Sequence, residues 1–178
     1  KDQRKLELLL EVSKGLSRAR DTDVLLGEVA GMVFEILEVD RVAVLLLDEA
    51  GELVPTVSRD ASGRTMEGLV PQSIARRAVE EKVAILSDNA PEDARFGGQS
   101  IIVQRVRSAI CAPLIGSEGQ VLGVIYVDNS TLTHRYTDDD LGFLIAFAGI
   151  AGVAIENSQL AERIRREAVV RRNFQRFF

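Results

Sequence analysis

The residue types that most often carry nucleophilic or metal chemistry are almost absent from this sequence. Its 178 residues contain one cysteine, Cys111, and one histidine, His134. A single cysteine excludes an internal disulfide and a cysteine-rich zinc cluster, and one histidine without further ligand spacing does not make a metal site. Cys111 lies between Ile110 and Ala112, so we interpret it as a small buried side chain. We interpret His134 as a surface loop residue and expect no metal and no cofactor.

A polar segment from Ser87 to Phe96 combines groups that can recognise a small molecule. It is rich in Pro, Asp and Asn and shows little periodicity, which predicts an exposed connection. Loops held on a rigid scaffold are common recognition sites. In such a site Asp88, Asn89 and Arg95 can form hydrogen bonds to a ligand, and Phe96 can form an aromatic wall.

The same segment has a purely structural interpretation, which the sequence leaves open. Asp and Asn side chains cap turns, so Asp88 and Asn89 can serve the backbone alone. Arg95 has acidic neighbours at positions 92 and 93 with which it can pair. Phe96 can anchor the loop on the core.

No pattern in the sequence predicts catalysis. Three consecutive aspartates at 138–140 suggest a metal site, but consecutive residues point in different directions from the start of a helix. Thr137 and Asp140 form a capping-box pattern, and acidic residues suit the positive end of a helix. A glycine-rich phosphate loop, an H-E-x-x-H motif and a recognisable nucleophile setting are all missing. We therefore expect no enzymatic activity from this segment.

Charge and hydropathy restrict the partners and the location of the chain. The net charge of −5 disfavours nucleic acid and anionic membrane, since both require clustered Lys and Arg. The longest uncharged apolar run, Leu141 to Ile155, has fifteen residues, whereas a membrane span needs about 20. We interpret it as a buried helix. With no signal peptide in view, we expect a cytoplasmic protein that contacts neither membrane nor nucleic acid.

Hydrophobic periodicity divides the chain into helices and strands. An amphipathic helix is predicted from Leu6 to about Arg20, and a second follows the capping residues 21–23. Segment 73–82 predicts a short helix, and a long helix is predicted to begin at 137. The expected strands are 41–48, 53–60, 83–88, 108–115 and 121–129, the first two forming a hairpin of core strands. Helices packed on one sheet make an α+β fold.

The two terminal helices carry narrow apolar stripes that are typical of a two-helix seam. Beyond 155 the apolar positions thin out, and six arginines with two glutamates in 161–178 suit the solvated faces of a paired helix. We therefore predict a homodimer whose seam contains Leu6, Leu9, Leu16, Leu160 and Ile164.

Four segments, in this order, resemble GAF domains: RVAVLLLDEAGELVP, ILSDNAPEDARF, RSAICAPLI and VLGVIYVDN. The resemblance covers about residues 6–157. It implies a GAF/PAS-like fold with about six antiparallel strands, terminal helices on one face, and a ligand cavity between the other face and its crossing loops. On this basis the chain divides into a signalling helix (1–20), a GAF domain (21–157) and a linker helix (158–178).

Three further segments are similar to GAF domains of bacterial adenylate cyclases, which often carry a forkhead-associated domain upstream: LLLEVSKGLSRARD, SIARRAVEEKVAILSDNA and REAVVRRNFQRFF. This similarity implies that a class III adenylate cyclase domain follows residue 178 as the output domain. Related GAF domains also precede transcriptional activators, kinases and phosphatases.

Cyclic-nucleotide-binding GAF domains resemble one another in an Asn-Lys, Phe, Asp-Glu signature, which this chain matches only in part. Asn129 and Asp140 match it, but Ser130 replaces Lys, Tyr136 replaces Phe and Leu141 replaces Glu. An ion pair between the Lys and the Glu cannot form here. We interpret Asn129 and Asp140 as turn and cap residues.

Two functions remain open. The first is a sensory domain in which a small ligand biases the pairing of the terminal helices and so regulates an output domain. The second is a structural dimerisation spacer. Polar residues that face a pocket favour the sensor, whereas the same residues facing water favour the spacer. The expected ligand contacts are Arg59, Asp88, Asn89, Arg95, Phe96 and Cys111.

Overall fold

The computed structural model describes residues 2–16, 21–65, 70–96, 106–130 and 136–177. Each predicted helix and strand has a counterpart, so the α+β class is confirmed. In chain order the elements are α1 (Asp2–Leu16), α2 (Thr22–Ile36), β1 (Arg41–Leu47), β2 (Leu53–Asp60), α3 (Gln72–Glu81), β3 (Ile85–Ser87), the 3₁₀ turns η1 (Ala90–Glu92) and η2 (Ala94–Phe96), β4 (Ser108–Ile115), β5 (Val121–Asn129) and α5 (Asp138–Phe177).

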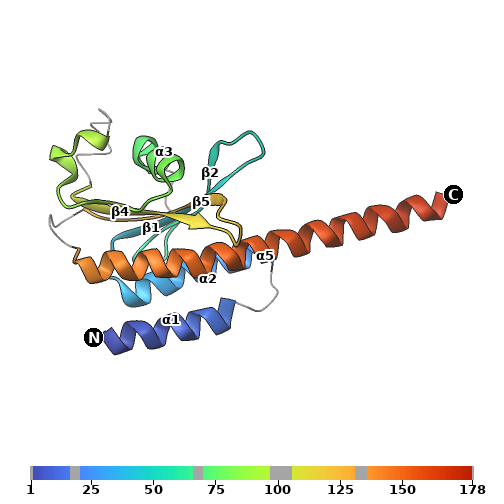
Figure 1. Ribbon diagram of the computed structural model, residues 1–178, viewed down its shortest axis with the longest axis horizontal. Coiled ribbons are helices and arrows are strands. Elements are labelled where there is room, and N and C mark those ends of the chain that lie inside the picture. The colour runs from blue at the N-terminus through green and yellow to red at the C-terminus, as the bar shows by residue number, and fades with distance from the viewer. Residues whose placement is uncertain (1, 17–20, 66–69, 97–105, 131–135, 178) are drawn as a thin grey trace.

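The described strands form one antiparallel sheet in the order β2-β1-β5-β4-β3. The family resemblance implied about six strands, and the described residues supply five. Figure 1 shows α3 and the 3₁₀ turns on one face of the sheet, here called the front face, and α1, α2 and α5 on the other, the back face. The predicted arrangement of terminal helices on one face is therefore confirmed.

Alternation along the strands builds a separate core on each face. On β1, Val42 and Val44 belong to the back core, while Ala43 and Leu45 belong to the front core. This is the period of two expected when a sheet is covered on both sides. The back core is the larger one, and α2 and α5 supply many of its fully buried side chains, including Leu25, Val29, Leu144, Phe147 and Ala151.

Strand β2 is an exposed edge, which corrects its prediction as a core strand. None of its eight residues is buried, and among the described strands only β1 pairs with it. Pro55 gives the physical reason, because proline cannot donate a ladder hydrogen bond and is confined to edge strands or bulges. The β1–β2 register does shift beside it, between Val44 and Leu45.

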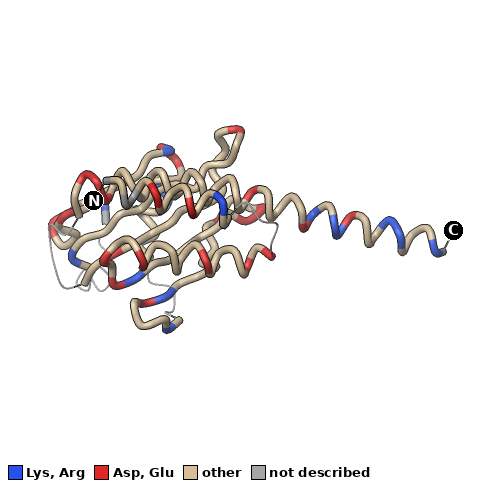
Figure 2. The backbone as a smooth tube through the Cα atoms, turned by 90° about the horizontal axis from the view of Figure 1, so that it is seen from below, with Lys and Arg blue, Asp and Glu red and all other residues tan. Residues whose placement is uncertain are grey.

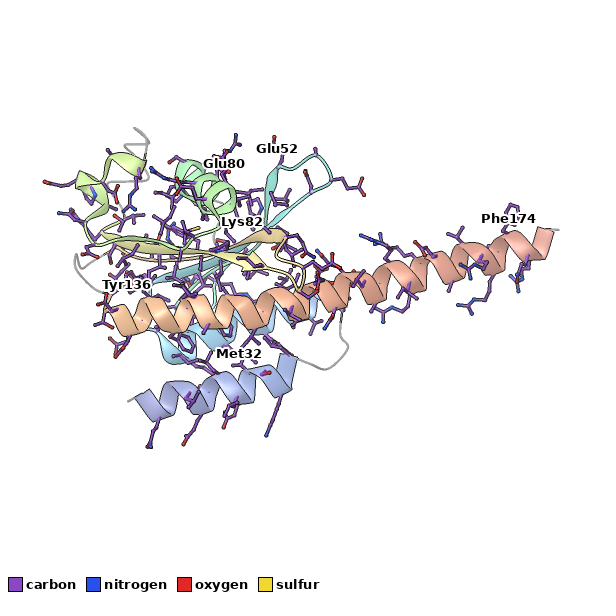
Figure 3. All side chains as sticks on the ribbon, in the orientation of Figure 1. Met32, Glu52, Glu80, Lys82, Tyr136 and Phe174 are labelled. Carbon is purple, nitrogen blue, oxygen red and sulfur yellow. The ribbon has the colours of Figure 1, made fainter. Side chains whose placement is uncertain are left out.

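Helix α5 serves both as part of the back core and as a rod that leaves the domain. Its first half packs on the sheet, and its second half projects beyond the domain, where Phe174 is 64% exposed (Figures 1 and 3). Among the described helices it alone is long and apolar enough to span a membrane, with a mean hydropathy of 1.6 in its most apolar window. One side of residues 143–155 packs on the sheet, which accounts for part of that apolar character, but only 44% of the window is buried. The buried-helix prediction therefore holds for that side alone.

The predicted capping box at the start of α5 is present. The Asp140 backbone N–H donates to Thr137 Oγ1 at 3.2 Å, and the Thr137 backbone N–H donates to Asp140 Oδ2 at 3.0 Å. Replacing Thr137 with alanine is expected to cost about 1 kcal/mol of unfolding free energy, the usual loss for a removed cap. Urea denaturation measures it, and Thr137→Ser, which keeps the hydroxyl, should retain most of the stability.

The predicted seam residues divide between the core and the surface. Leu16 is only 3% exposed and belongs to the back core, so it is a core residue with little area left for a dimer seam. Leu9 packs partly against the same core. Leu6, Leu160 and Ile164 are exposed. Helix α1 uses one side to cover the domain, which a stripe read from sequence cannot distinguish from an intermolecular seam.

Candidate functional site

The polar segment after β3 folds into an open pocket at the edge of the sheet. Strand β3 ends at Ser87, and two 3₁₀ turns carry the chain back over it. The pocket has a volume of about 580 Å³, within the range of small-molecule sites. Its lining is Leu86, Ser87, Asp88, Asn89, Glu92, Asp93, Ala94 and Arg95, which brings together three of the predicted ligand contacts. The Phe96 side chain lies outside the described part of the structure.

Arg95 braces this pocket. Its Nη2 donates to the Leu86 carbonyl at 2.7 Å and to Asp93 Oδ2 at 2.6 Å, while its Nε donates to Asp93 Oδ1 at 2.9 Å. The Arg95 guanidinium holds the pKa of Asp93 well below its ordinary value, and Asp93 raises the pKa of Arg95. The Ser73 hydroxyl of α3 donates to the Arg95 carbonyl at 2.9 Å. The structural interpretation of Arg95 is thus confirmed, and its partner is Asp93.

The pocket carries a negative charge. Three carboxylates, those of Asp88, Glu92 and Asp93, line it together with one guanidinium, that of Arg95. Because Arg95 is already bonded to Asp93, its charge is largely neutralised within the loop. The exposed carboxylate of Glu92 therefore favours a ligand with hydrogen-bond donors or a positive charge, and it disfavours a phosphate.

A second polar cluster, which the sequence did not reveal, is buried on the front face. Asp128 is fully buried and accepts bonds from Arg41 Nε at 2.9 and 3.1 Å and from the Tyr126 hydroxyl at 2.8 Å. Arg41 Nη2 also forms an ion pair with it. Burial alone lowers the pKa of Arg41, but Asp128 raises it above its ordinary value. Burial raises the pKa of Tyr126 well above normal, so its hydroxyl stays a donor.

Cys111 lies next to this cluster in the sheet, opposite Tyr126. It is fully buried in the front core, as predicted, and burial raises the pKa of its thiol well above normal. A thiol nucleophile must be exposed and ionised. Cys111 is therefore unsuited to redox or covalent chemistry, and it does not line the pocket at the end of β3.

Arg59 is also absent from the pocket. It lies on β2 opposite Val42 of the back core, and its Nη1 donates to the Gly27 carbonyl of α2 at 3.4 Å. Arg59 thus faces α2, so its assignment as a ligand contact on the loop-covered face is wrong. The period of two along β2 places it on that side.

The residues of the partial cyclic-nucleotide signature have structural roles. Asp140 belongs to the α5 capping box, as predicted, and Tyr136 is buried in the back core. Ser130, where the signature has Lys, donates to Asp40 Oδ2 through its backbone N–H at 2.8 Å and its hydroxyl at 2.9 Å. The Asn129 carbonyl accepts the Arg107 N–H at 2.8 Å. His134 lies outside the described residues.

Known proteins share this fold and this sequence pattern. The chain is 26% identical over 182 residues to dual 3',5'-cyclic-AMP and -GMP phosphodiesterase 11A of Takifugu rubripes, a match that covers 94% of the chain and 20% of that protein. The chain thus spans about a fifth of the length of this curated relative.

Two solved structures are similar throughout. Free methionine-R-sulfoxide reductase of Neisseria meningitidis superposes with a TM-score of 0.72 at 19% identity, covering 90% of this chain and 93% of that one. The GAF domain of a phosphoenolpyruvate-protein phosphotransferase of Coxiella burnetii gives a TM-score of 0.72 at 15% identity, covering 91% and 98%. At these identities the likeness shows the fold.

The family follows from the sequence match together with this fold. The model of the GAF domain family matches residues 21–155, which include α2, the whole described sheet and the core half of α5. The chain belongs to the GAF domain family.

Proposed function

We propose that this domain is the sensory module of a bacterial signalling protein, in which a small polar molecule binds the pocket at the end of β3 and α5 transmits the change. GAF domains are typical of regulatory and sensory proteins and are non-catalytic in most cases, although the reductase structures show that some proteins of this fold are enzymes. The buried thiol of Cys111, the one cysteine of the chain, argues against such chemistry here.

The observation that carries this proposal is the continuity of α5. The helix packs its first half on the back of β4 and extends without a break to residue 177. Strand β4 pairs with β3, and β3 ends in the pocket. A ligand that shifts the β3 edge therefore acts on the strand against which α5 rests. Packed elements transmit such displacements because interiors are dense and resist compression.

The proposed ligand is neutral or cationic and rich in hydrogen-bond donors. This follows from the excess of carboxylates in the pocket and from the neutralisation of Arg95 by Asp93. Cyclic AMP and cyclic GMP are disfavoured at this site because each carries a phosphate. The replacement of the signature Lys by Ser130 supports the same conclusion.

The proposed output domain is a class III adenylate cyclase that follows the linker helix. Support comes from the similarity of the exit segment REAVVRRNFQRFF to adenylate cyclase linkers. The phosphodiesterase relative, which acts on cyclic AMP and cyclic GMP by its name, places a similar domain in cyclic-nucleotide signalling. In this proposal, ligand binding in the pocket changes cyclase activity through α5.

A thermal-shift screen of the purified domain tests the ligand proposal. The panel contains diamines, amino acids, cyclic AMP and cyclic GMP, and a ligand at 100 times its Kd stabilises the fold by about 2.7 kcal/mol. We expect a cationic or neutral donor-rich compound to raise the melting temperature and the cyclic nucleotides to leave it unchanged. Glu92→Lys should weaken binding of a cationic ligand at least tenfold, about 1.4 kcal/mol.

The matched control is Glu80→Lys, which makes the same charge change on the exposed surface of α3 (Figure 3). Binding that survives Glu92→Lys as well as it survives Glu80→Lys would place the ligand elsewhere. No shift with any compound would leave the second candidate, a dimerisation spacer. One observation favours that candidate: α3 fills the front face with its own side chains, Ile74, Ala75 and Ala78, against the sheet.

A further inference from the structure

One face of α5 remains uncovered from the domain into the projection. Its residues follow one another at intervals of four, three and four, an 11-residue repeat of 3.67 per turn, which keeps them on one side of a nearly straight helix. All are exposed, and all but one are apolar or glycine. The α5 stripe, as we call it, consists of Gly142, Ala146, Gly149, Val153, Asn157, Leu160 and Ile164.

The stripe forms one wall of a groove between α1 and α5. The groove has a volume of about 420 Å³, and it is lined by four stripe residues from Ala146 to Asn157 and by Ser13 and Leu16 of α1. A Cβ built on Gly142 or Gly149 meets nothing within 4 Å. Leu6 and Leu10, at helical spacing from Ser13, extend the apolar surface along α1 and are more than half exposed. The surface has room for a helix laid along α5.

The order of small and large residues identifies the helix that fits. Gly142 and Ile164 lie eleven residues on either side of Val153, and Ala146 and Leu160 lie seven. A second α5 running antiparallel, with Val153 opposite Val153, therefore sets the larger residue of every other stripe pair over a small one. This self-complementarity is what a two-fold interface requires. A parallel pair would set Ile164 against Ile164 and leave the space over Gly142 empty.

Charge favours the same arrangement. The antiparallel register sets the acidic start of one α5, with the exposed Asp138 and Asp139, against segment 165–171 of the other, which has three arginines and one glutamate. Segment 161–178 has six arginines and two glutamates, so it is net +4, and the rest of the −5 chain is net −9. Figure 2 shows the basic residues along the projection and many acidic ones on the domain. Parallel pairing would set two basic projections side by side.

We propose that two copies of this chain pair through the α5 stripe with their α5 helices antiparallel and Val153 at the two-fold axis. This rests on the homodimer predicted from the terminal helices and adds its orientation. Each projection then lies along the partner's domain and contacts the start of the partner's α5. The pocket of one copy thereby acts on the linker helix of the other.

Disulfide cross-linking of variants with one added cysteine tests the orientation. The native Cys111 does not interfere, because it is fully buried and cannot form an intermolecular disulfide. The variants are Gly142→Cys, Val153→Cys and Ile164→Cys in the 178-residue chain. After mild oxidation we expect covalent dimers from Val153→Cys alone and from a mixture of the other two. Gly142→Cys or Ile164→Cys alone should give at least tenfold less. Efficient cross-linking of Ile164→Cys with itself, and none in the mixture, would establish a parallel pair and overturn the proposal.

Charge substitution tests the surface itself. Ile164→Glu should weaken the dimer at least tenfold, as measured by light scattering across a concentration series. The control is Val169→Glu, which should leave the dimer unchanged because Val169 is also exposed but lies on the opposite side of α5. A monomeric wild-type chain with no Val153→Cys cross-link would overturn the pairing and the predicted homodimer together. The thermal-shift screen detects ligand binding whether or not the chain dimerises. A failure of the dimer proposal is therefore distinguishable from a failure of the ligand proposal.

Discussion

Replacing Asp128 with alanine is expected to lower the free energy of unfolding by about 3–5 kcal/mol, the usual cost of removing one partner of a buried ion pair. Asp128 is fully buried, and it accepts from Arg41 and Tyr126. Its loss removes this acceptor from the guanidinium of Arg41, whose side chain is 17% exposed, and from the buried hydroxyl of Tyr126. Because Arg41 and Asp128 join β1 to β5, the variant weakens the centre of the sheet. Urea denaturation monitored by circular dichroism measures the loss.

Two further variants separate the charge from the hydrogen bond. Tyr126→Phe removes one neutral donor and should cost about 1 kcal/mol. The double variant Arg41→Met/Asp128→Leu removes both charges and should recover much of the stability that Asp128→Ala loses, since paired apolar groups can replace a buried ion pair. A loss below about 1 kcal/mol for Asp128→Ala would mean that Arg41 reaches solvent once its partner is gone.

The Arg41–Asp128 cluster shows the limit of prediction from this sequence. The strands that carry it were predicted from their apolar runs, and the first two strands were predicted to form a hairpin. The two residues are 87 positions apart, and they meet because β1 lies beside β5 with Arg41 opposite Asp128. Neither fact follows from periodicity, which specifies a strand and its two faces but not its neighbour or its register.

Interactions between residues close in the sequence were easier to predict. The capping box joins residues three apart, and the Arg95–Asp93 pair joins residues two apart, so both appear in the sequence as adjacent complementary groups. The exposure of β2 could have been predicted as well, because Pro55 lies inside the strand pattern. The burial of Leu16 could not, since it depends on where α1 lies against the back core.

Replacing Gly152 with alanine is expected to destabilise the domain by about 1–3 kcal/mol, the usual cost of overpacking a close contact. The added Cβ would lie 2.5 Å from the carbonyl oxygen and 2.8 Å from the nitrogen of Ile115. These are backbone atoms of β4, so no side-chain rotation relieves the clash, and α5 must move away from the strand. Chemical denaturation measures the effect, and the same displacement should weaken any ligand response that passes through α5.

Gly31→Ala in α2 is the matched control. Its added Cβ meets nothing within 4 Å, and alanine is favoured over glycine inside a helix by up to about 1 kcal/mol. Both substitutions remove the same backbone freedom from the unfolded chain, so the difference between them isolates the contact of α5 with β4. With both variants at one protein concentration, we expect Gly31→Ala to be at least as stable as the wild type. Equal stability of the two variants would show that α5 can shift on β4 at no cost, and a helix that shifts so freely could not transmit a signal from the pocket.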